Sequence, residues 1–183
     1  MKWPIALSFA VVLAGSGIGA STAQTTPTAQ TAPPSATPIR AQKLVDDAMV
    51  KHPEVVILSM HVTPPQKTEN VIIASDTRPQ NLPHSSQLPH HTQPAWIGKR
   101  SNAGDERVIN SGKSSQEVNK AGNRFEITVP LEDHSGKTIG AVGVVFNYKE
   151  GDDKGKFQKV AEQIRDEWRA QIASKDSLFE PAK

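Results

Sequence analysis

The stretch RFEITVPLEDHSGKTIGAVGVVFNY, residues 124–148, decides the fold. Two runs rich in β-branched residues, 124–131 and 138–148, flank the turn EDHSGK, where Gly136 can supply the positive φ of a tight turn. The second run is apolar at both alternating sets of positions, so both faces of its strand must be covered. The sequence therefore predicts an antiparallel hairpin whose second strand is buried on both faces.

Further strands lie upstream of this hairpin. Residues 116–119 precede the turn KAGN and extend the hairpin to a three-stranded meander. The segments EVVILSMHV (54–62) and NVIIAS (70–75) are β-branched and are separated by a turn-rich gap, which predicts a second hairpin. Five antiparallel strands are thus expected.

Helical spacing of apolar residues marks both ends of this region. Before Pro53 the apolar positions are Ala41, Leu44, Val45, Ala48 and Met49. After the last strand they are Phe157, Val160, Ala161, Ile164, Trp168 and Ile172. A short helix, DERVINS (105–111), is expected to end at Gly112. The expected fold class is α+β, a five-stranded antiparallel sheet flanked by N- and C-terminal helices.

The terminal helices can cover one face of this sheet, and the loops between the second and third strands must cover the other, where a small cavity would form. Ser59 and His61 alternate along the first strand and make one face polar at one end. His61 is either a ligand contact or a buried histidine satisfied by a backbone carbonyl. Arg124 is a candidate carboxylate clamp and Trp96 a candidate pocket wall; edge capping and core packing are their structural alternatives.

The N-terminus has the order of a secretion signal. Lys2 precedes an apolar run, 5–13, and a small-residue stretch that ends with Ser21 and Ala23. We expect residues 1–23 to be a cleaved signal peptide, with an uncleaved membrane anchor as the alternative. The mature protein would then be periplasmic or secreted and would have no membrane span.

The remaining chain divides by composition. Residues 24–39 are rich in Thr, Pro and Ala, and such a segment cannot bury enough apolar surface to fold. A disordered spacer is expected there, with a mucin-like stalk as the alternative. The folded domain is expected at 40–175, followed by a flexible tail at 176–183.

Composition also limits the chemistry. The chain has no cysteine, which excludes disulfides, thiolate catalysis and cysteine-based zinc sites. Its 21 Lys and Arg against 19 Asp and Glu give no reason to expect nucleic acid as a partner. No Gly-x-Ser-x-Gly, His-Glu-x-x-His or Ser-x-x-Lys motif occurs, so no enzymatic activity is expected. The adjacent Asp133, His134 and Ser135 are expected to point into water from a hairpin turn.

Two segments resemble metal sites without matching them. His84, His90 and His91 lie within residues 77–94, and their spacing favours a solvated loop over a zinc, copper or nickel site. The segment EGDDKG (150–155) resembles half a calcium loop, but Lys154 stands where an oxygen ligand belongs, so a turn is expected. No cofactor or metal is therefore expected.

Three stretches, taken in order and spacing, resemble the extracellular PAS-like sensor domains called Cache domains. They are HPEVVILSMHV with NVIIASD, IGKRSNAGDERVINSGK, and FEITVPLEDHSGKTIGAVGVVF. The resemblance implies a five-stranded antiparallel sheet with helices on one side and a small-molecule pocket on the other. It also implies a ligand such as an amino acid or carboxylate.

Such domains usually sit between two membrane spans and drive an output domain, neither of which is evident here, and residues 77–94 form an insertion. The resemblance therefore implies a free-standing sensor that acts through a partner such as a membrane receptor or kinase. The alternative is a periplasmic protein-interaction module without a bound ligand.

Overall fold

The computed structural model describes residues 38–78, 96–119 and 122–183. The predicted signal peptide, the spacer up to residue 37, and His84, His90 and His91 lie outside the described residues. Among the residues that the structure describes, no helix is long and apolar enough to cross a membrane.

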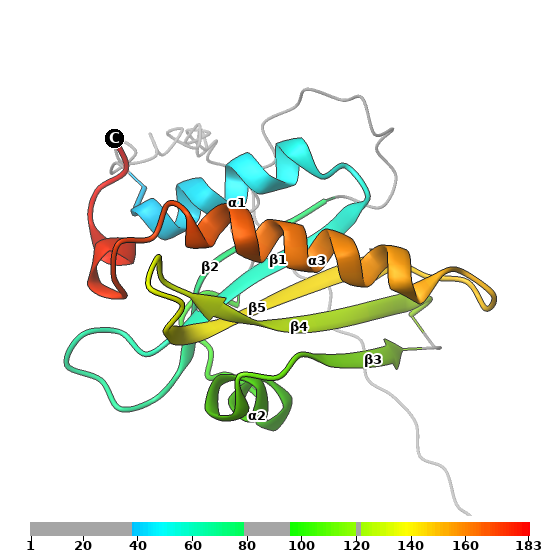
Figure 1. The fold of residues 1–183 in the computed structure, drawn as a ribbon, viewed down its shortest axis with the longest axis horizontal. Coiled ribbons are helices and arrows are strands. Elements are labelled where there is room, and N and C mark those ends of the chain that lie inside the picture. Colours follow the sequence, from blue (N-terminus) through cyan, green and yellow to red (C-terminus); the bar gives the residue numbers. More distant parts are fainter. Residues whose placement is uncertain (1–37, 79–95, 120–121) are drawn as a thin grey trace, which may run out of the picture. The chain divides into compact units, whose positions relative to one another are not determined.

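Five antiparallel strands form one sheet in the order β2-β1-β5-β4-β3 (Figure 1). They are β1 (Val55–Val62), β2 (Val71–Thr77), β3 (Ser115–Asn119), β4 (Arg124–Glu132) and β5 (Thr138–Asn147). The predicted α+β class, the meander of the last three strands and the hairpin of the first two are confirmed. The hairpin and the meander join through β1 and β5, where Ser59 lies opposite Gly143.

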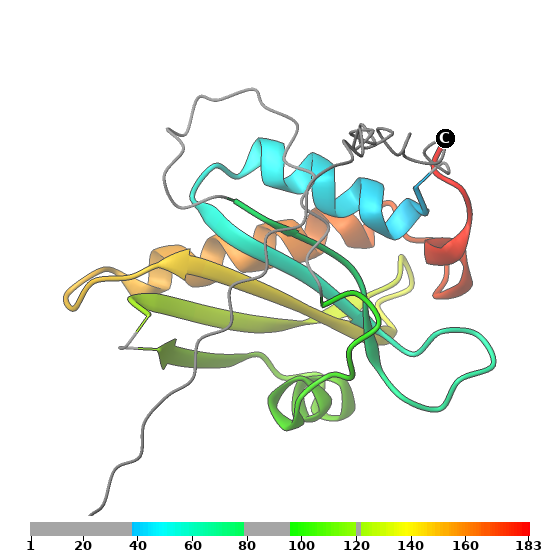
Figure 2. The ribbon, with the colours of Figure 1, turned by 180° about the vertical axis from the view of Figure 1, so that it is seen from behind.

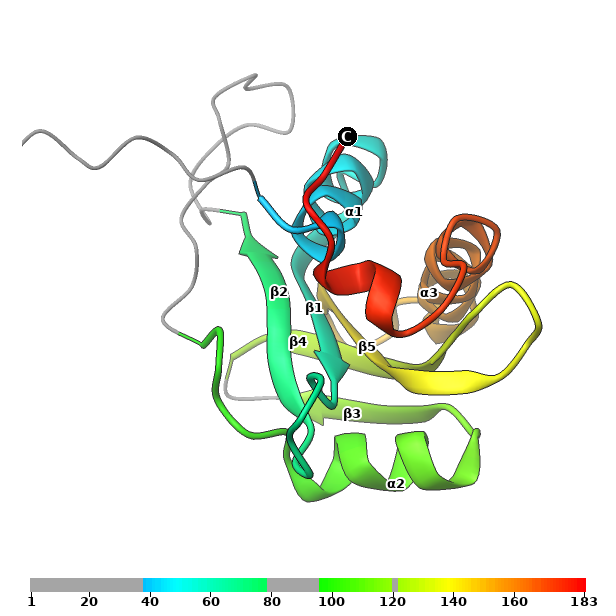
Figure 3. The ribbon, with the colours of Figure 1, turned by 90° about the vertical axis from the view of Figure 1, so that its left-hand side faces the viewer.

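Helices α1 (Arg40–Lys51) and α3 (Lys154–Arg169) lie on one face of the sheet (Figure 3). α1 packs against β1 and β2, and α3 against β4 and β5. The core between them contains one face of each long strand, as in Leu58 and Met60 of β1 and Val142 and Val144 of β5. Trp168 of α3 is 2% exposed, so the predicted apolar face of the closing helix is confirmed.

Helix α2 (Ala103–Ser111) lies on the opposite face and contacts β4 and β5 (Figure 3). Its first turn is closed by a capping box: the Asn102 side chain accepts from the Asp105 backbone N–H, and the Asp105 side chain accepts from the Asn102 N–H. Gly112 ends the helix with φ 66° and ψ 14°, the left-handed conformation that glycine adopts without strain. The loop expected to cover this face thus contains a helix fixed at both ends.

The C-terminal residues 176–183 were expected to be a flexible tail, and this prediction is wrong. They contain a 3-10 helix, η1 (Asp176–Phe179), whose Leu178 is 0% exposed in the core. The segment then passes beside the start of α1 (Figure 2), where Ile39 pairs with Pro181 in a bridge. Burial of Leu178 and these backbone bonds extend the domain beyond the expected 40–175 at both ends.

The segments EDHSGK (132–137) and EGDDKG (150–155), which the sequence predicts as turns, are turns in the structure. In the β4–β5 turn, however, Asp133 folds back instead of pointing into water: its Oδ1 accepts from Ser135 N at 2.9 Å and from Lys137 N at 3.2 Å. In 150–155, Asp153 is the N-cap of α3 and accepts from the Gly155 and Lys156 N–H groups. Both carboxylates satisfy backbone donors of their own segments.

Candidate functional site

The sheet face beneath α2 is polar in its central part. Ser59 pairs with Gly143 across β1 and β5, and Gly143 pairs with Thr128 across β5 and β4, so all three positions share this face. His61 lies two residues beyond Ser59, and Glu126 two residues before Thr128, on the same face. The structure thus places Ser59 and His61 together, as the alternation along the strand predicts.

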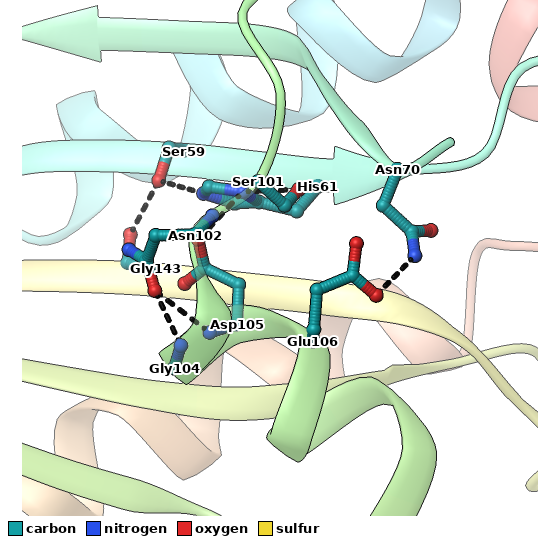
Figure 4. Close-up of polar contacts among 9 residues, drawn as sticks. All are labelled: Ser59, His61, Asn70, Ser101, Asn102, Gly104, Asp105, Glu106 and Gly143. Atoms are coloured by element: carbon teal, nitrogen blue, oxygen red, sulfur yellow. Dashed lines mark hydrogen bonds and ion pairs between the residues drawn. The ribbon is translucent and has the colours of Figure 1, made fainter.

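His61 is the centre of a buried hydrogen-bonded cluster (Figure 4). Its Nε2 lies 2.9 Å from Ser59 Oγ, and its Nδ1 lies 3.0 Å from Ser101 Oγ. The same Nδ1 lies 3.3 Å from Asp105 Oδ2. His61 is 5% exposed. Its two ring nitrogens contact side chains, not a backbone carbonyl, which was the alternative expectation for a buried histidine at this position. We call Ser59, His61, Ser101 and Asp105 the His61 cluster.

Asp105 links this cluster to α2. Its side chain is 2% exposed, and its Oδ2 accepts from Asn102 N at 3.0 Å while facing the His61 ring. One carboxylate therefore closes the first turn of the helix and holds the imidazole. Sequence reasoning missed Asp105 and Ser101 as site residues, although the Asn-x-x-Asp spacing of 102–105 is a readable capping signal.

Gly143 makes room for the cluster. A Cβ at residue 143 would lie 2.6 Å from Ser59 Oγ, 3.6 Å from His61 Nε2 and 3.6 Å from Glu126 Oε1. Three polar atoms therefore surround a point above β5 that only glycine leaves open. Glu126, which sequence reasoning also missed, is in this way brought beside Ser59 and His61.

Burial changes the acidity of two of these groups. It lowers the pKa of His61, and the Asp105 carboxylate partly opposes that change. Burial also raises the pKa of Glu126, with further repulsion from the Asp105 and Glu117 carboxylates. Within the described part of the chain, the Glu126 carboxylate has neither a hydrogen-bond nor an ion-pair partner. At neutral pH His61 is therefore uncharged and able to act as a base. The Glu126 carboxyl group has no cationic side chain paired with it in the described residues.

A cavity of about 70 Å³ opens between α2 and the strands β3 and β4. The side chains that matter for its charge are Asp105, Arg107, Glu117 and Glu126. Three carboxylates thus face one guanidinium, which favours a cationic group in the cavity. In the described ranges no group of three or more His, Cys, Asp or Glu side chains could hold a metal ion.

The structure does not bring Arg124 and Trp96 to this cavity. Arg124 donates to the Asn147 side chain at the far end of β4, about 13 Å along the strand from Thr128 at 3.3 Å per residue. Trp96 is half-buried in the turn that runs beside β2, where its carbonyl oxygen accepts from Lys99 N at 2.8 Å. The length of β4 thus separates Arg124 from the polar face that carries Ser59 and His61.

No protein-family model matches this chain. No curated protein matches it in sequence. Among solved structures, 41 chains match.

Three of these structures illustrate the matches. The PobR inducer-binding domain from Acinetobacter, in complex with 3-hydroxybenzoic acid, is 14% identical, with 75% of this chain and 100% of that chain covered and a TM-score of 0.45. A free methionine-R-sulfoxide reductase from Thermoplasma acidophilum is 14% identical (76% and 92% covered, TM-score 0.47). A phycocyanobilin-bound GAF domain of a cyanobacterial phytochrome is 10% identical (75% and 86% covered, TM-score 0.47). Likeness at this level carries no conclusion about function.

Proposed function

We propose that this chain is an exported, free-standing sensor domain of the Cache type, which binds a small metabolite such as an amino acid and acts through a partner protein. The observation that carries the proposal is Glu126, a half-buried carboxylate without a described partner, across Gly143 from the His61 cluster. The sequence resemblance supports the family, and the order of the N-terminal residues supports export. The helices on one face of the sheet and the cavity on the other are consistent with that resemblance.

The charge of the cavity indicates which end of a ligand it takes. Burying an unpaired carboxylate is unfavourable, so a ligand group that neutralises Glu126 gains affinity. An ammonium group meets this need, whereas the carboxylate that Arg124 was expected to clamp does not. Arg107 is exposed on the cavity wall and has no ion-pair partner among the described residues, so it is the candidate contact for a ligand carboxylate.

The size of the cavity limits how the ligand is held. At about 70 Å³ it is smaller than the 300–1,000 Å³ typical of pockets for drug-sized ligands. It therefore admits a head group such as an ammonium, and the remainder of the ligand lies at the rim near Arg107. A small amino acid or amine fits this arrangement best.

A thermal-shift screen of amino acids, amines and short carboxylates tests the proposal. A ligand at one hundred times its Kd adds about 2.7 kcal/mol, which raises Tm by several degrees. We expect the stabilising compounds to carry an amine and their effect to disappear in Glu126→Gln. Arg124→Ala is the matched control and should keep the shift. Loss of the shift in Arg124→Ala alone, or hits confined to carboxylates, would contradict the assignment.

The absence of any stabilising compound would favour a protein-interaction module. One feature supports that second function: β3 pairs with β4 on one side only, within the described sheet. Its Gln116 and Glu117 side chains are exposed. An open edge strand can accept an extended segment of a partner.

A further inference from the structure

We propose that Ser59 is an activated nucleophile, which His61 deprotonates, and that it accepts the acyl group of small esters. This inference uses atoms of the His61 cluster and does not depend on the ligand proposed above. The sequence carries no nucleophile motif, but a nucleophile, a base and an orienting carboxylate are recognised by geometry rather than by chain order.

The tautomer of His61 decides which hydroxyl is activated. The Asp105 carboxylate accepts hydrogen bonds only, and it lies 3.3 Å from Nδ1. It therefore favours the tautomer with the proton on Nδ1, where Ser101 Oγ at 3.0 Å can accept it. The Nε2 lone pair then faces the Ser59 hydroxyl at 2.9 Å, within the reach of a general base, and this contact is shorter than the competing one from Ser59 Oγ to the Gly143 carbonyl oxygen at 3.4 Å.

The surroundings keep this arrangement in place. Asp105 is held by the Asn102 N–H at 3.0 Å, and Ser59 Oγ lies over Gly143, where a side chain would displace it. Burial keeps His61 uncharged at neutral pH, which is the state that a base requires. The side chains that face the ring from α2 and its lead-in are Asp105 and Ser101, and Glu126 of β4 lies across Gly143.

The reaction step is the transfer of the acyl group from the ester to the Ser59 hydroxyl oxygen. The Ser59 Oγ forms a bond to the ester carbonyl carbon, and its proton passes to His61 Nε2. The bond from carbon to the alkoxy oxygen breaks, and that oxygen takes the proton from Nε2. The products are acyl-Ser59 and the free alcohol, and attack by water releases the carboxylic acid and restores Ser59.

The substrate class follows from space and charge. Ser59 is 9% exposed and does not itself line the cavity of about 70 Å³, whose wall residue Thr128 lies across Gly143 from it, so only a short acyl group can approach the hydroxyl. The carboxylates of Asp105, Glu117 and Glu126 repel anionic esters. Short-chain esters that are neutral or cationic are therefore the expected donors.

The test is covalent labelling of the full chain with 4-nitrophenyl acetate and with a small dialkyl fluorophosphate, followed by intact mass and peptide mapping. We expect one adduct, on Ser59. His61→Gln should slow its formation about 100-fold or more. Asp105→Asn should slow it as well, because the amide no longer selects the Nδ1 tautomer. The labelling rate of the unmodified chain should fall at acidic pH as His61 becomes protonated.

Ser75 is an internal control. It pairs with Ser59 across β1 and β2 and is 1% exposed, but its hydroxyl donates to the Leu58 carbonyl. We expect no adduct on Ser75 and full labelling of Ser59 in Ser75→Ala. Circular dichroism establishes that each variant is folded. No adduct, an adduct on Ser101 or Ser75, or an unchanged rate in folded His61→Gln would each overturn the proposal.

Discussion

The hydroxyl of Ser59 lies where a side chain on Gly143 would begin, because a Cβ at residue 143 would be 2.6 Å from Ser59 Oγ. This close approach joins β1 to the central strand β5 at the middle of the polar face. It also ties the packing of the sheet to the geometry of the His61 cluster.

The first prediction concerns this pair. Gly143→Ala should lower the free energy of unfolding by about 1–3 kcal/mol, because the added methyl group overpacks the site. In Ser59→Ala/Gly143→Ala the clash is removed, so the double variant should be less destabilised than the sum of the single variants by about 1 kcal/mol or more. Urea denaturation measures all three.

Gly140 provides the matched control for that cycle. A Cβ there would overlap the backbone oxygen of His61, which no side-chain change removes. Gly140→Ala should therefore be destabilising in both backgrounds, with effects that add to Ser59→Ala. Simple additivity in the Gly143 cycle as well would contradict the contact.

The second prediction is a pH dependence of stability from His61. Its pKa is lowered in the folded state, so the unfolded chain binds the proton more readily. Its contribution is constant above the ordinary pKa of about 6.5, and the free energy of unfolding falls as the pH drops below that value. His61→Gln should remove this part of the slope in urea midpoints between pH 7.5 and 5, whereas His134→Gln, at an exposed position, should leave it.

The third prediction is a pH dependence of stability from Glu126, opposite in sign to that from His61. The pKa of Glu126 is raised in the folded state, so this group favours folding below about pH 4.3 and opposes it as the pH rises through the folded pKa. Glu126→Gln should therefore stabilise the ligand-free protein at pH 7 by about 0.5–2 kcal/mol, and by less at pH 4. Thermal unfolding at both pH values measures this, with the exposed Glu150→Gln as control. A destabilised Glu126→Gln would mean that the carboxylate has a structural partner.

The fourth prediction tests the face of α3. Trp168 is 2% exposed, so Trp168→Ala should destabilise the domain by about 3–5 kcal/mol. Arg169, which is 46% exposed and lies 3.3 Å from Glu132, should contribute less than about 1 kcal/mol. Chemical denaturation compares the two alanine variants, and similar losses would refute the orientation of the helix.

The fifth prediction separates a folded C-terminus from a flexible one. Leu178 is 0% exposed, so Leu178→Ala should lower the free energy of unfolding by about 2–5 kcal/mol. Removal of the exposed Lys183 alone should change it by less than about 0.5 kcal/mol. A Leu178→Ala variant with unchanged stability would restore the expectation of a loose tail.

Much of the local structure could be read from residue patterns. Alternation predicted the polar face of Ser59 and His61, and the spacing of Trp168 predicted the buried side of the last helix. Both periodicities belong to a single strand or helix, so they need no knowledge of distant neighbours. The burial of Leu178 was not predicted, because one apolar residue in a short polar segment has no period.

The sequence by itself determined the five strands, the terminal helices and the side of each that is buried, since backbone geometry translates local spacing into faces. Only the tertiary structure decided that β1 lies beside β5, with 84 residues between Ser59 and Gly143, that Asp105 meets His61, and that Glu126 lies across Gly143 from it. It also left Arg124 outside the site. The physical reason is that strand pairing is selected by burial of the whole apolar face, and a polar cluster forms wherever that selection brings its members together.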